Sequence, residues 1–424
     1  MLTSADVDRK VSVLLFRIGE YVIHHGAIGI ARSLGRLGIP VYATVEDRYT
    51  PLAMCRHLAG TFVNRTTDAN DVLNCLRSIA ERMKGPTILL PTDDNAAVFI
   101  AEHAKHLSDH FLFPHLRAEL PRQLADKMSL YALCRRAGIP CPDFAFPTSL
   151  EEVHEFVERT TFPIIVKAAD HSRPLHNCYR SLIVRTPEEL RAICGPPEFF
   201  RRPNMILQEH IPGEDWIFHG YRNAETDSLV GFTGRKLRSY PPFAGPTTLG
   251  VSIRNDRLEE QAGVMLRDIG YSGIMDLDYR RDERDGQYKL VDFNPRVGAN
   301  FRMFETSEGI DVVRALHLDL TGRQIRRSPM IEGRTFVVEL YDLVASLTYP
   351  RRGRLSVQAW RKSLAGTREL AWWSWDDPVP FLAMGVRLLL RVAARTARRN
   401  GGKVLLRVRR TNKLLHFGAR SKKA

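Results

Sequence analysis

The sequence predicts a protein of mixed α/β and α+β class: a parallel-sheet N-terminal domain, a second domain built around a polar β-hairpin, and a basic C-terminal tail that is mainly helical. Three observations predict it. Strand and helix patterns alternate over the first hundred residues, two apolar runs flank a polar turn near residue 285, and no acidic residue follows Asp377. Alternating patterns are typical of parallel sheets, whereas hairpins join antiparallel strands. We expect domains at 1–117, 118–325 and 326–424.

Composition places the chain among globular proteins. Its 424 residues have room for two or three domains, and 44% hydrophobic with 26% charged residues argues against disorder. The six cysteines form no C-x-x-C pair, which favours a reducing compartment. The N-terminal segment is polar and no apolar run reaches 18 residues. We therefore expect a cytoplasmic protein without a signal peptide or a transmembrane helix.

The first elements form a βαβ unit. The apolar run 11–16 is a strand, the segment 30–38 a helix and the segment 39–44 another strand, joined by a right-handed crossover. The run 87–92 is a further strand, followed by an Ala-rich helix. The glycines near residue 19 do not spell the dinucleotide-binding motif, so a dinucleotide site is not expected.

Polar residues follow two of these strands. Ligands bind at the carboxyl ends of strands in parallel sheets. His24, His25, Asp93 and Asp94 are therefore candidate substrate contacts. The alternatives are loop filling for the histidines and helix N-capping for the aspartates.

The most informative segment is the hairpin around residue 285. Two apolar-flanked runs, 274–279 and 291–296, enclose a polar turn with an Asp-Gly step. Alternate side chains of a strand share a face, so Asp292, Asn294 and Arg296 converge, and pairing brings Asp278 beside them. Carboxylate and amide oxygens suit Mg²⁺, and arginine suits a phosphoryl group. The alternative is an edge hairpin with solvated charges.

Upstream segments supply further parts of a nucleotide site. Lys167 ends a short apolar strand and could neutralise phosphate, or lie on the surface. The strand from Met205 stops at a Pro-Gly turn, where backbone groups could bind an adenine edge. The segment 124–128 opens a helical run that ends at 136–140, where Gly138 and Pro140 supply the stop.

Together these segments resemble the carboxylate–amine ligases of the ATP-grasp superfamily, of the carbamoyl-phosphate synthase and D-aspartate ligase type. The resemblance covers about residues 11 to 325. It is carried by Asp126-Lys127, the run 164–167, the run Gln208-Glu209-His210-Ile211-Pro212-Gly213, the run 234–238 and the hairpin from Asp278 to Arg296. It implies an N-terminal pre-ATP-grasp domain followed by a two-lobed ATP-grasp fold.

The resemblance also implies roles for individual residues. Lys127 and Lys167 would contact ATP phosphates, and Arg296 would face the reacting phosphoryl group. The adenine would be held by the run Gln208, Glu209, His210 and Ile211, through backbone groups of Glu209 and Ile211, and the ribose by Glu214 or Asp215. Asp278, Asp292 and Asn294 would bind two Mg²⁺ ions, with Mn²⁺ as an alternative.

Two features depart from the family pattern. Many members carry glutamate where this chain has Asp278 and Asp292, so the hairpin must lie closer to the metals. The loop over the phosphates is usually rich in glycine, but residues 169–177 contain none. Side-chain donors such as His171, Ser172 and Arg173 would have to compensate for less accessible backbone amides.

The expected reaction joins a small-molecule carboxylate to an amine, through an acyl phosphate, with release of ADP. Arg235, Lys236 and Arg238 form a basic run that we expect to face the phosphates or the acidic substrate, with Arg235 and Lys236 assisting Arg296 in catalysis. Residues 247–250 would line the acceptor site. The alternatives are carboxylation or thioester formation, and a non-catalytic nucleotide-binding protein at a membrane.

The positive charge is concentrated in the tail. Of the net charge of +14, the 13 Lys and Arg residues between Arg387 and Lys423 account for nearly all, so the core need not bind nucleic acid. Arginines recur at helical spacing from about 381 to 399, after tryptophans at 372, 373 and 375. This pattern suits peripheral attachment to an anionic membrane at its inner face. The alternatives are a helix packed on its own domain and, less favoured, a nucleic-acid-binding arm. No pattern indicates the oligomeric state.

Overall fold

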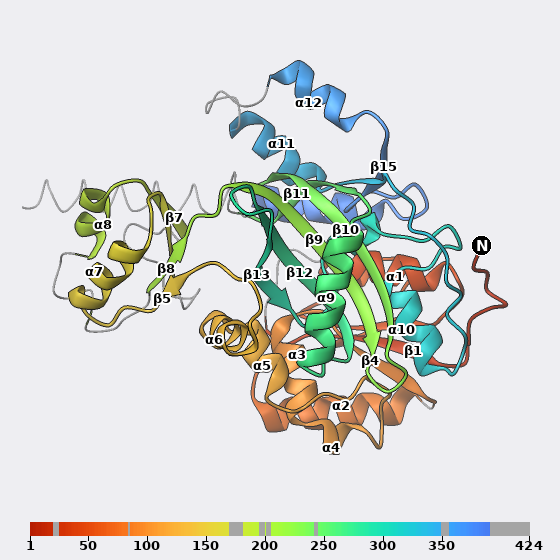
Figure 1. Cartoon of the computed structure of the whole chain (residues 1–424). Helices are drawn as coiled ribbons and strands as arrows, with labels where there is room; N and C mark the ends of the chain where they lie inside the picture. The colour runs from red at the N-terminus through yellow and green to blue at the C-terminus, as the bar shows by residue number, and fades with distance from the viewer. Residues whose placement is uncertain are drawn as a thin grey trace, which may run out of the picture.

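The computed structural model contains three β-sheets with helices around them (Figure 1). The residues that the structure describes are 1–19, 25–83, 85–168, 181–194, 200, 205–240, 245–348 and 356–390. Every structural statement below refers to these residues. Among them, no helix has both the length and the apolar character needed to cross a bilayer, and the five described cysteines are free thiols.

The N-terminal sheet is parallel throughout, with strand order β3-β2-β1-β4. Its strands are β1 (Ser12–Phe16), β2 (Val41–Val45), β3 (Gly60–Val63) and β4 (Thr87–Pro91). Its helices are α1 (His25–Gly35), α2 (Ala69–Met83), α3 (Asp94–Glu102) and α4 (Ala104–Leu107). The predicted strands and the parallel arrangement are confirmed. The edge strand β3 was not predicted, because its four residues are half exposed and carry little pattern.

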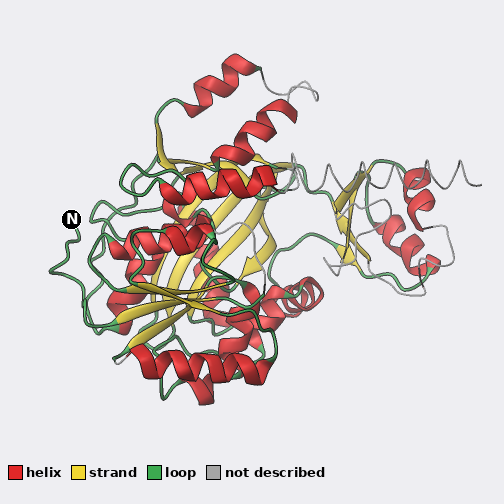
Figure 2. Ribbon diagram, turned by 180° about the vertical axis from the view of Figure 1, so that it is seen from behind, coloured by secondary structure: helices red, strands yellow, loops and turns green. Residues whose placement is uncertain are grey.

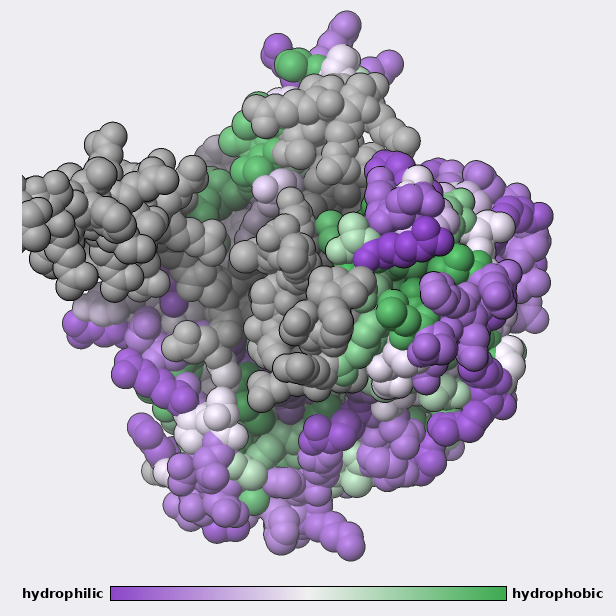
Figure 3. Space-filling model, turned by 90° about the vertical axis from the view of Figure 1, so that its left-hand side faces the viewer, coloured by the Kyte–Doolittle hydropathy of each residue, from purple (hydrophilic) through white to green (hydrophobic). Residues whose placement is uncertain are grey.

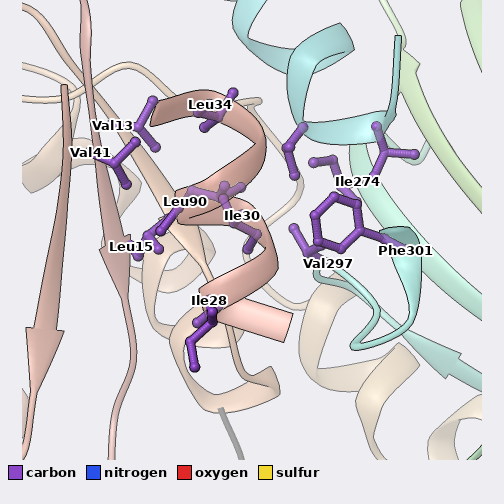
Figure 4. Packing of buried hydrophobic residues seen from close by; sticks show 14 of the residues in the cluster. Val13, Leu15, Ile28, Ile30, Leu34, Val41, Leu90, Ile274, Val297 and Phe301 are labelled. Atoms are coloured by element: carbon purple, nitrogen blue, oxygen red, sulfur yellow. The ribbon is translucent and has the colours of Figure 1, made fainter. Parts of the chain in front are cut away.

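Helix α1 joins the N-terminal sheet to the rest of the protein. Ile28 and Ile30 on this helix are almost fully buried and belong to the cluster that contains Val13 of β1. The same cluster includes Val297 and Phe301, which lie beyond the central hairpin (Figure 4). One core therefore continues from the first sheet to the segment that follows Arg296.

The central sheet has seven strands, in the order β13-β12-β9-β10-β11-β14-β15. They are β9 (Gly213–Asn223), β10 (Ser228–Ser239), β11 (Thr247–Ser252), β12 (Gly273–Asp282), β13 (Tyr288–Asn294), β14 (Thr335–Val337) and β15 (Thr367–Leu370). Strands β12 and β13 pair antiparallel, with Asp278 opposite Asp292 and Asp276 opposite Asn294. The predicted hairpin is confirmed in both pairing and register. Flanking elements are α9 (Asp256–Asp268), α10 (Val312–Leu320) and the 3₁₀ helices η1 (Pro51–Met54) and η4 (Phe301–Met303).

A third, antiparallel sheet forms a smaller lobe that projects from the body of the molecule (Figures 1 and 2). Its order is β5-β8-β6-β7, with β5 (Phe144–Ala145), β6 (Ile164–Ala168), β7 (Ser181–Val184) and β8 (Met205–Glu209). Helices α7 (Leu150–Arg159) and α8 (Pro187–Cys194) belong to it, and α5 (Leu120–Ala125) and α6 (Lys127–Ala137) precede it. As predicted, α6 ends at Gly138, whose φ of 64° is the left-handed cap that glycine adopts readily. The expected second lobe is thus present.

The C-terminal region is more than a helical tail. Strands β14 and β15 complete the central sheet. Helix α11 (Glu339–Thr348) packs against β10 and β11, and α12 (Val357–Leu364) is joined to it by a hydrogen bond from Trp360 to Asp342. Trp372 is fully buried against His25 of α1, so it is not one of the membrane-facing tryptophans that the sequence suggested. Residues 379–390 are helical, whereas the remainder of the predicted tail helix lies outside the described residues.

Candidate functional site

Two lysine–aspartate pairs lie on the hairpin. Lys127 places its Nζ 2.9 Å from Oδ1 of Asp292, and Lys236 of β10 places its Nζ 2.8 Å from Oδ2 of Asp278. Lys127 begins α6 directly after Asp126, which caps the helix by accepting a hydrogen bond from the amide of Ser129. The cap fixes where the helix starts, and hence where Lys127 enters the site.

The two carboxylates of these pairs differ in their electrostatics. Burial opposes the ionisation of Asp292, but Lys127 and Lys167 outweigh it and hold its pKa below the usual range. Burial raises the pKa of Asp278, and Lys236 offsets this only in part because Asp276 and Asp292 add negative charge. When buried carboxyl groups lie side by side, a cation that binds between them stabilises their ionised forms strongly. This hairpin face is therefore suited to a metal ion.

Lys167 lies near the same acids but bonds to an amide. Its Nζ donates a 2.8 Å hydrogen bond to Oε1 of Gln208 on β8. Burial and the charge of Lys127 lower the pKa of Lys167 to about 7. Tyr131 donates to the same amide oxygen at 3.2 Å, which fixes the orientation of Gln208. A phosphate group beside this lysine would stabilise its protonated form.

Arg296 lies where the hairpin meets the N-terminal sheet. It donates to Oδ1 of Asn294 at 2.9 Å and to Oδ2 of Asp276 at 3.2 Å, and its Nε lies 3.2 Å from Asp94 at the start of α3. Asn294 in turn donates to the backbone carbonyl of Asp276. Of the polar residues that were candidate substrate contacts in the N-terminal domain, Asp94 lies beside Arg296 at the end of the hairpin.

One part of the site was not identified from the sequence. His219 of β9 is fully buried, and its Nε2 lies 2.5 Å from Oδ1 of Asp276. The ring is not oriented for a regular hydrogen bond, so the contact between the two side chains is described as an ion pair. Burial opposes the ionisation of Asp276, but His219 and Arg296 hold its pKa below the usual range, at about 2. The alternation of Asp276 with Asp278 in sequence could have suggested the first residue, whereas nothing local marked His219.

The expected adenine segment is held by arginines. The amide of Glu209 donates to the carbonyl of Asp143, and the carbonyl of Ile211 accepts from Arg280. Any adenine contact through these two residues is therefore left to the Glu209 carbonyl and the Ile211 amide. The Glu209 side chain pairs with Arg284 of the hairpin turn. His210 is partly buried, and burial lowers its pKa.

The expected ribose acids are both ion-paired. Glu214 lies 2.6 Å from Arg235, and Asp215 lies 2.8 Å from Arg280. Gly213, which precedes them, has a φ of 130° and would place a Cβ only 2.0 Å from the carbonyl oxygen of Arg281. Only glycine fits this turn. Arg235 thus borders the ribose segment and does not contact the acids of the hairpin.

Four sequence expectations need correction. Arg238 does not face the site, because it is buried and makes two 2.8 Å contacts with Asp342 of α11. Thr248 also binds Asp342 and so does not line an acceptor site.

Asp93 caps α3 by accepting from the amide of Ala96, and His25 is packed among rings, so neither is a substrate contact. His24 and the phosphate loop 169–177, with His171, Ser172 and Arg173, lie outside the described residues.

The donor set fits Mg²⁺ bound together with a phosphorylated ligand. Within the described part of the chain, no three His, Cys, Asp or Glu side chains gather as a self-sufficient metal site. What the hairpin offers is two carboxylates on opposed residues and the amide oxygen of Asn294. Mg²⁺ commonly uses one or two carboxylates and completes its shell with phosphate and water. A paired set of this size suits that mode of binding.

Parts of the sequence are similar to known proteins. No protein-family model matches the sequence. The chain is 26% identical over 261 residues to D-aspartate ligase of Enterococcus faecium (strain Aus0004), an alignment that covers 58% of this chain and 60% of the relative. It is also 23% identical over 243 residues to the biotin carboxylase of Allochromatium vinosum (strain ATCC 17899), covering 54% of this chain and 53% of that protein. The chain thus spans little more than half the length of these curated relatives.

A solved structure shares the fold over a larger part of the chain. It is the Staphylococcus aureus N5-carboxyaminoimidazole synthetase complexed with ADP, with a TM-score of 0.57 at 12% identity. The match covers 77% of this chain and 80% of that one. At this identity the likeness concerns the fold alone.

Proposed function

Because the chain belongs to the ATP-grasp superfamily, we propose that it is an ATP-dependent carboxylate–amine ligase. In this proposal ATP phosphorylates a substrate carboxylate, an amine displaces the phosphate, and an amide, ADP and phosphate are released. The observation that carries the proposal is the pair of lysine–aspartate contacts on opposed residues of the hairpin, Lys127–Asp292 and Lys236–Asp278.

The two partners of each contact would supply different parts of a metal–nucleotide site. The carboxylates of Asp278 and Asp292, with Asn294, would hold Mg²⁺, and the ammonium groups of Lys127 and Lys236 would bind phosphate oxygens. Bound Mg²⁺ would supply charge neutralisation at the phosphates. A ligand that brings both cations and phosphates can exchange with such pairs without leaving any buried charge unpaired.

Arg296 is the residue we assign to the reacting phosphoryl group. Its planar guanidinium presents several donors at once, which suits a group on which charge develops over three oxygens. Its present partners Asp94, Asp276 and Asn294 hold the guanidinium at the junction of the two sheets. Lys236 would assist from β10. Arg235 would act on the ribose side, because its partner is Glu214.

The substrate panel follows from the relatives. D-aspartate is the first compound to test because one relative is named as its ligase, and bicarbonate is the second because another is a carboxylase. Release of ADP should require Mg²⁺, a carboxylate and an amine together, and mass spectrometry should detect the amide. ADP release that depends on bicarbonate but not on an amine would favour the carboxylation alternative. ATP binding with no turnover on any substrate would favour a non-catalytic protein.

We also propose that the tail attaches the protein to an anionic membrane surface, so that a cytoplasmic enzyme would act at the inner face. Phe381 and Met384 fix the helix at 379–390 to the core, and its exposed side carries Leu382, Val386 and Leu389 at helical spacing. On the face in Figure 3, hydrophilic side chains cover much of the described surface and hydrophobic ones gather in its middle and upper parts. Beyond residue 390 the sequence is basic and has no acid. This combination suits a lipid surface.

A further inference from the structure

The strongest feature outside the expected set is the contact between His219 and Asp276. The two residues are direct partners in the pairing of β9 with β12. His219 has no exposed surface, and neither of its ring nitrogens has a hydrogen-bond partner among the described residues. A buried imidazole is costly to desolvate unless it meets a polar partner. Within the described part of the chain, it meets Oδ1 of Asp276 at 2.5 Å.

The same carboxylate holds Arg296 from the other side. Oδ2 of Asp276 accepts from Arg296 at 3.2 Å, while Oδ1 is taken by His219. Without the imidazole beside Oδ1, the carboxylate would be free to turn both oxygens toward the guanidinium, because bidentate pairing with arginine is favourable. His219 therefore limits how closely Asp276 can engage Arg296.

The chain leaves room for this arrangement at one glycine. A Cβ on Gly298 would lie 2.2 Å from Cε1 of His219 and 2.6 Å from Cγ of Asp276. Contacts this short cannot be accommodated without displacement of the pair. Phe304 packs against the imidazole on another side, with ring centroids 5.0 Å apart. The imidazole is thus confined by the surrounding chain.

We propose that His219 and Asp276 act as a positioning pair that sets the orientation of Arg296 for phosphoryl transfer. The inference rests on the ligase function proposed above. The imidazole occupies one carboxylate oxygen, so that Asp276 meets Arg296 through the other oxygen alone and holds the guanidinium in one orientation. Neither residue of the pair needs to touch the substrate.

The test is a set of variants at His219 in the full chain, assayed for Mg²⁺- and substrate-dependent ADP release. His219→Leu removes the polar contact to Oδ1 of Asp276 and should lower kcat about 10²-fold, the loss that a displacement of about 1 Å can cause. The Kd for ATP should change little. His219→Gln keeps a polar group near the position of Nε2 and should recover most of the rate. In an Asp276→Asn background, His219→Leu should cost much less, because the carboxylate that it restrains is absent.

A matched control separates positioning from stability. His317 is also fully buried, with Nε2 3.2 Å from the carbonyl of Val11, far from the hairpin in sequence. His317→Leu should lower the melting temperature as His219→Leu does and leave kcat of the folded protein unchanged. Gly298→Ala should reproduce the kcat loss of His219→Leu, whereas Gly385→Ala, which has no atom near its Cβ, should not.

The outcomes are distinct. If the wild type turns over and His219→Leu keeps its kcat, or if the losses from His219 and Asp276 variants simply add, the positioning role is wrong and the ligase function stands. If the wild type releases no ADP with any substrate, both proposals fall.

Discussion

The ion pairs on the hairpin differ in their exposure to solvent from the ion pairs that join the C-terminal region to the core, which we call the C-terminal junction. At the hairpin, Lys127 and Asp292 are 17% and 32% exposed and meet through one contact. At the junction, Arg238 and Asp342 are 5% and 1% exposed and meet through two contacts of 2.8 Å. The hairpin pair lies where a ligand can reach it, whereas the junction pair is sealed between β10 and α11.

A second junction pair follows the same rule. Arg32 of α1 binds Asp377 at 2.9 Å and also donates to the carbonyl of Trp372, and Cys55 contacts the same carboxylate. Removal of one partner from a buried pair leaves an uncompensated charge, whereas an accessible lysine can change partners. The arginine pairs hold the C-terminal region to the core, and we expect the lysine pairs to exchange partners when a ligand binds.

The largest expected effect is at the hairpin. Asp292→Ala removes an expected Mg²⁺ ligand and should reduce ADP release below detection, with little change in melting temperature because Asp292 is not part of a hydrophobic cluster. Asp268→Ala, at an exposed residue in the last turn of α9, is the control. Near-normal turnover by Asp292→Ala would contradict both the metal assignment and the contrast drawn above.

The second prediction concerns the junction. Asp342→Ala leaves Arg238 buried without its partner and should lower the free energy of unfolding by about 3–5 kcal/mol. Urea unfolding followed by fluorescence measures this loss. The kcat of the protein that remains folded should be unchanged. A loss of kcat without a loss of stability would instead assign Arg238 a role in catalysis.

The third prediction tests Arg296. Arg296→Lys keeps the charge but loses the planar fork, and should cost about 3 kcal/mol of transition-state stabilisation, or roughly 10²-fold in kcat. The Kd for ATP should change little. Equal losses in kcat and in ATP affinity would assign Arg296 to ground-state nucleotide binding.

The fourth prediction uses the lowered pKa of Lys167, which is about 7 against an ordinary value of 10.5. Above pH 7 the free folded protein loses this proton, whereas phosphate favours the charged form, so ATP binding takes up a proton. The affinity should therefore fall as pH rises, by about tenfold between pH 7 and pH 8.5. Lys167→Met should bind ATP weakly with a flatter pH profile, which calorimetry in buffers of different ionisation enthalpy can measure. An equally steep profile in the variant would assign the proton to another group.

The same shift affects stability in a defined direction. Between the folded pKa near 7 and the unfolded value of 10.5, the unfolded chain binds the extra proton at Lys167. This residue therefore makes the folded state more stable as pH rises through that window, and its cost is largest below pH 7. Lys167→Met should remove this contribution.

The smallest expected effect on turnover is that of the tail. Deletion of residues 391–424 keeps Phe381 and Met384 in the core, unlike a cut after Pro380, and should leave ADP release unchanged. Co-sedimentation with anionic vesicles should be lost on deletion and weakened by salt, since charges are screened beyond about 10 Å at 0.1 M. Absence of the full chain from anionic vesicles at low salt would rule out the membrane proposal.

Several features could be predicted from the sequence because they depend on local pattern. The strands β1, β2 and β4, the end of α6 at Gly138 and the hairpin with Asp278 opposite Asp292 each follow from alternation, turn residues and caps. The candidate role of Lys167 followed from its place at the end of an apolar strand. The assigned roles of these residues in binding and catalysis remain predictions.

Only the tertiary structure decided which partner each charge has. Arg238 and Lys236 lie two residues apart in sequence, but a bulge in β10 between them accompanies their different partners, Asp342 and Asp278. His219 carried no signal at all, because its role depends on a neighbour 57 positions away in an adjacent strand. Composition and periodicity determine where strands and helices form, since those depend on near neighbours. Pairing of buried charges depends on which strands lie side by side, and that is set by the packing of the whole chain.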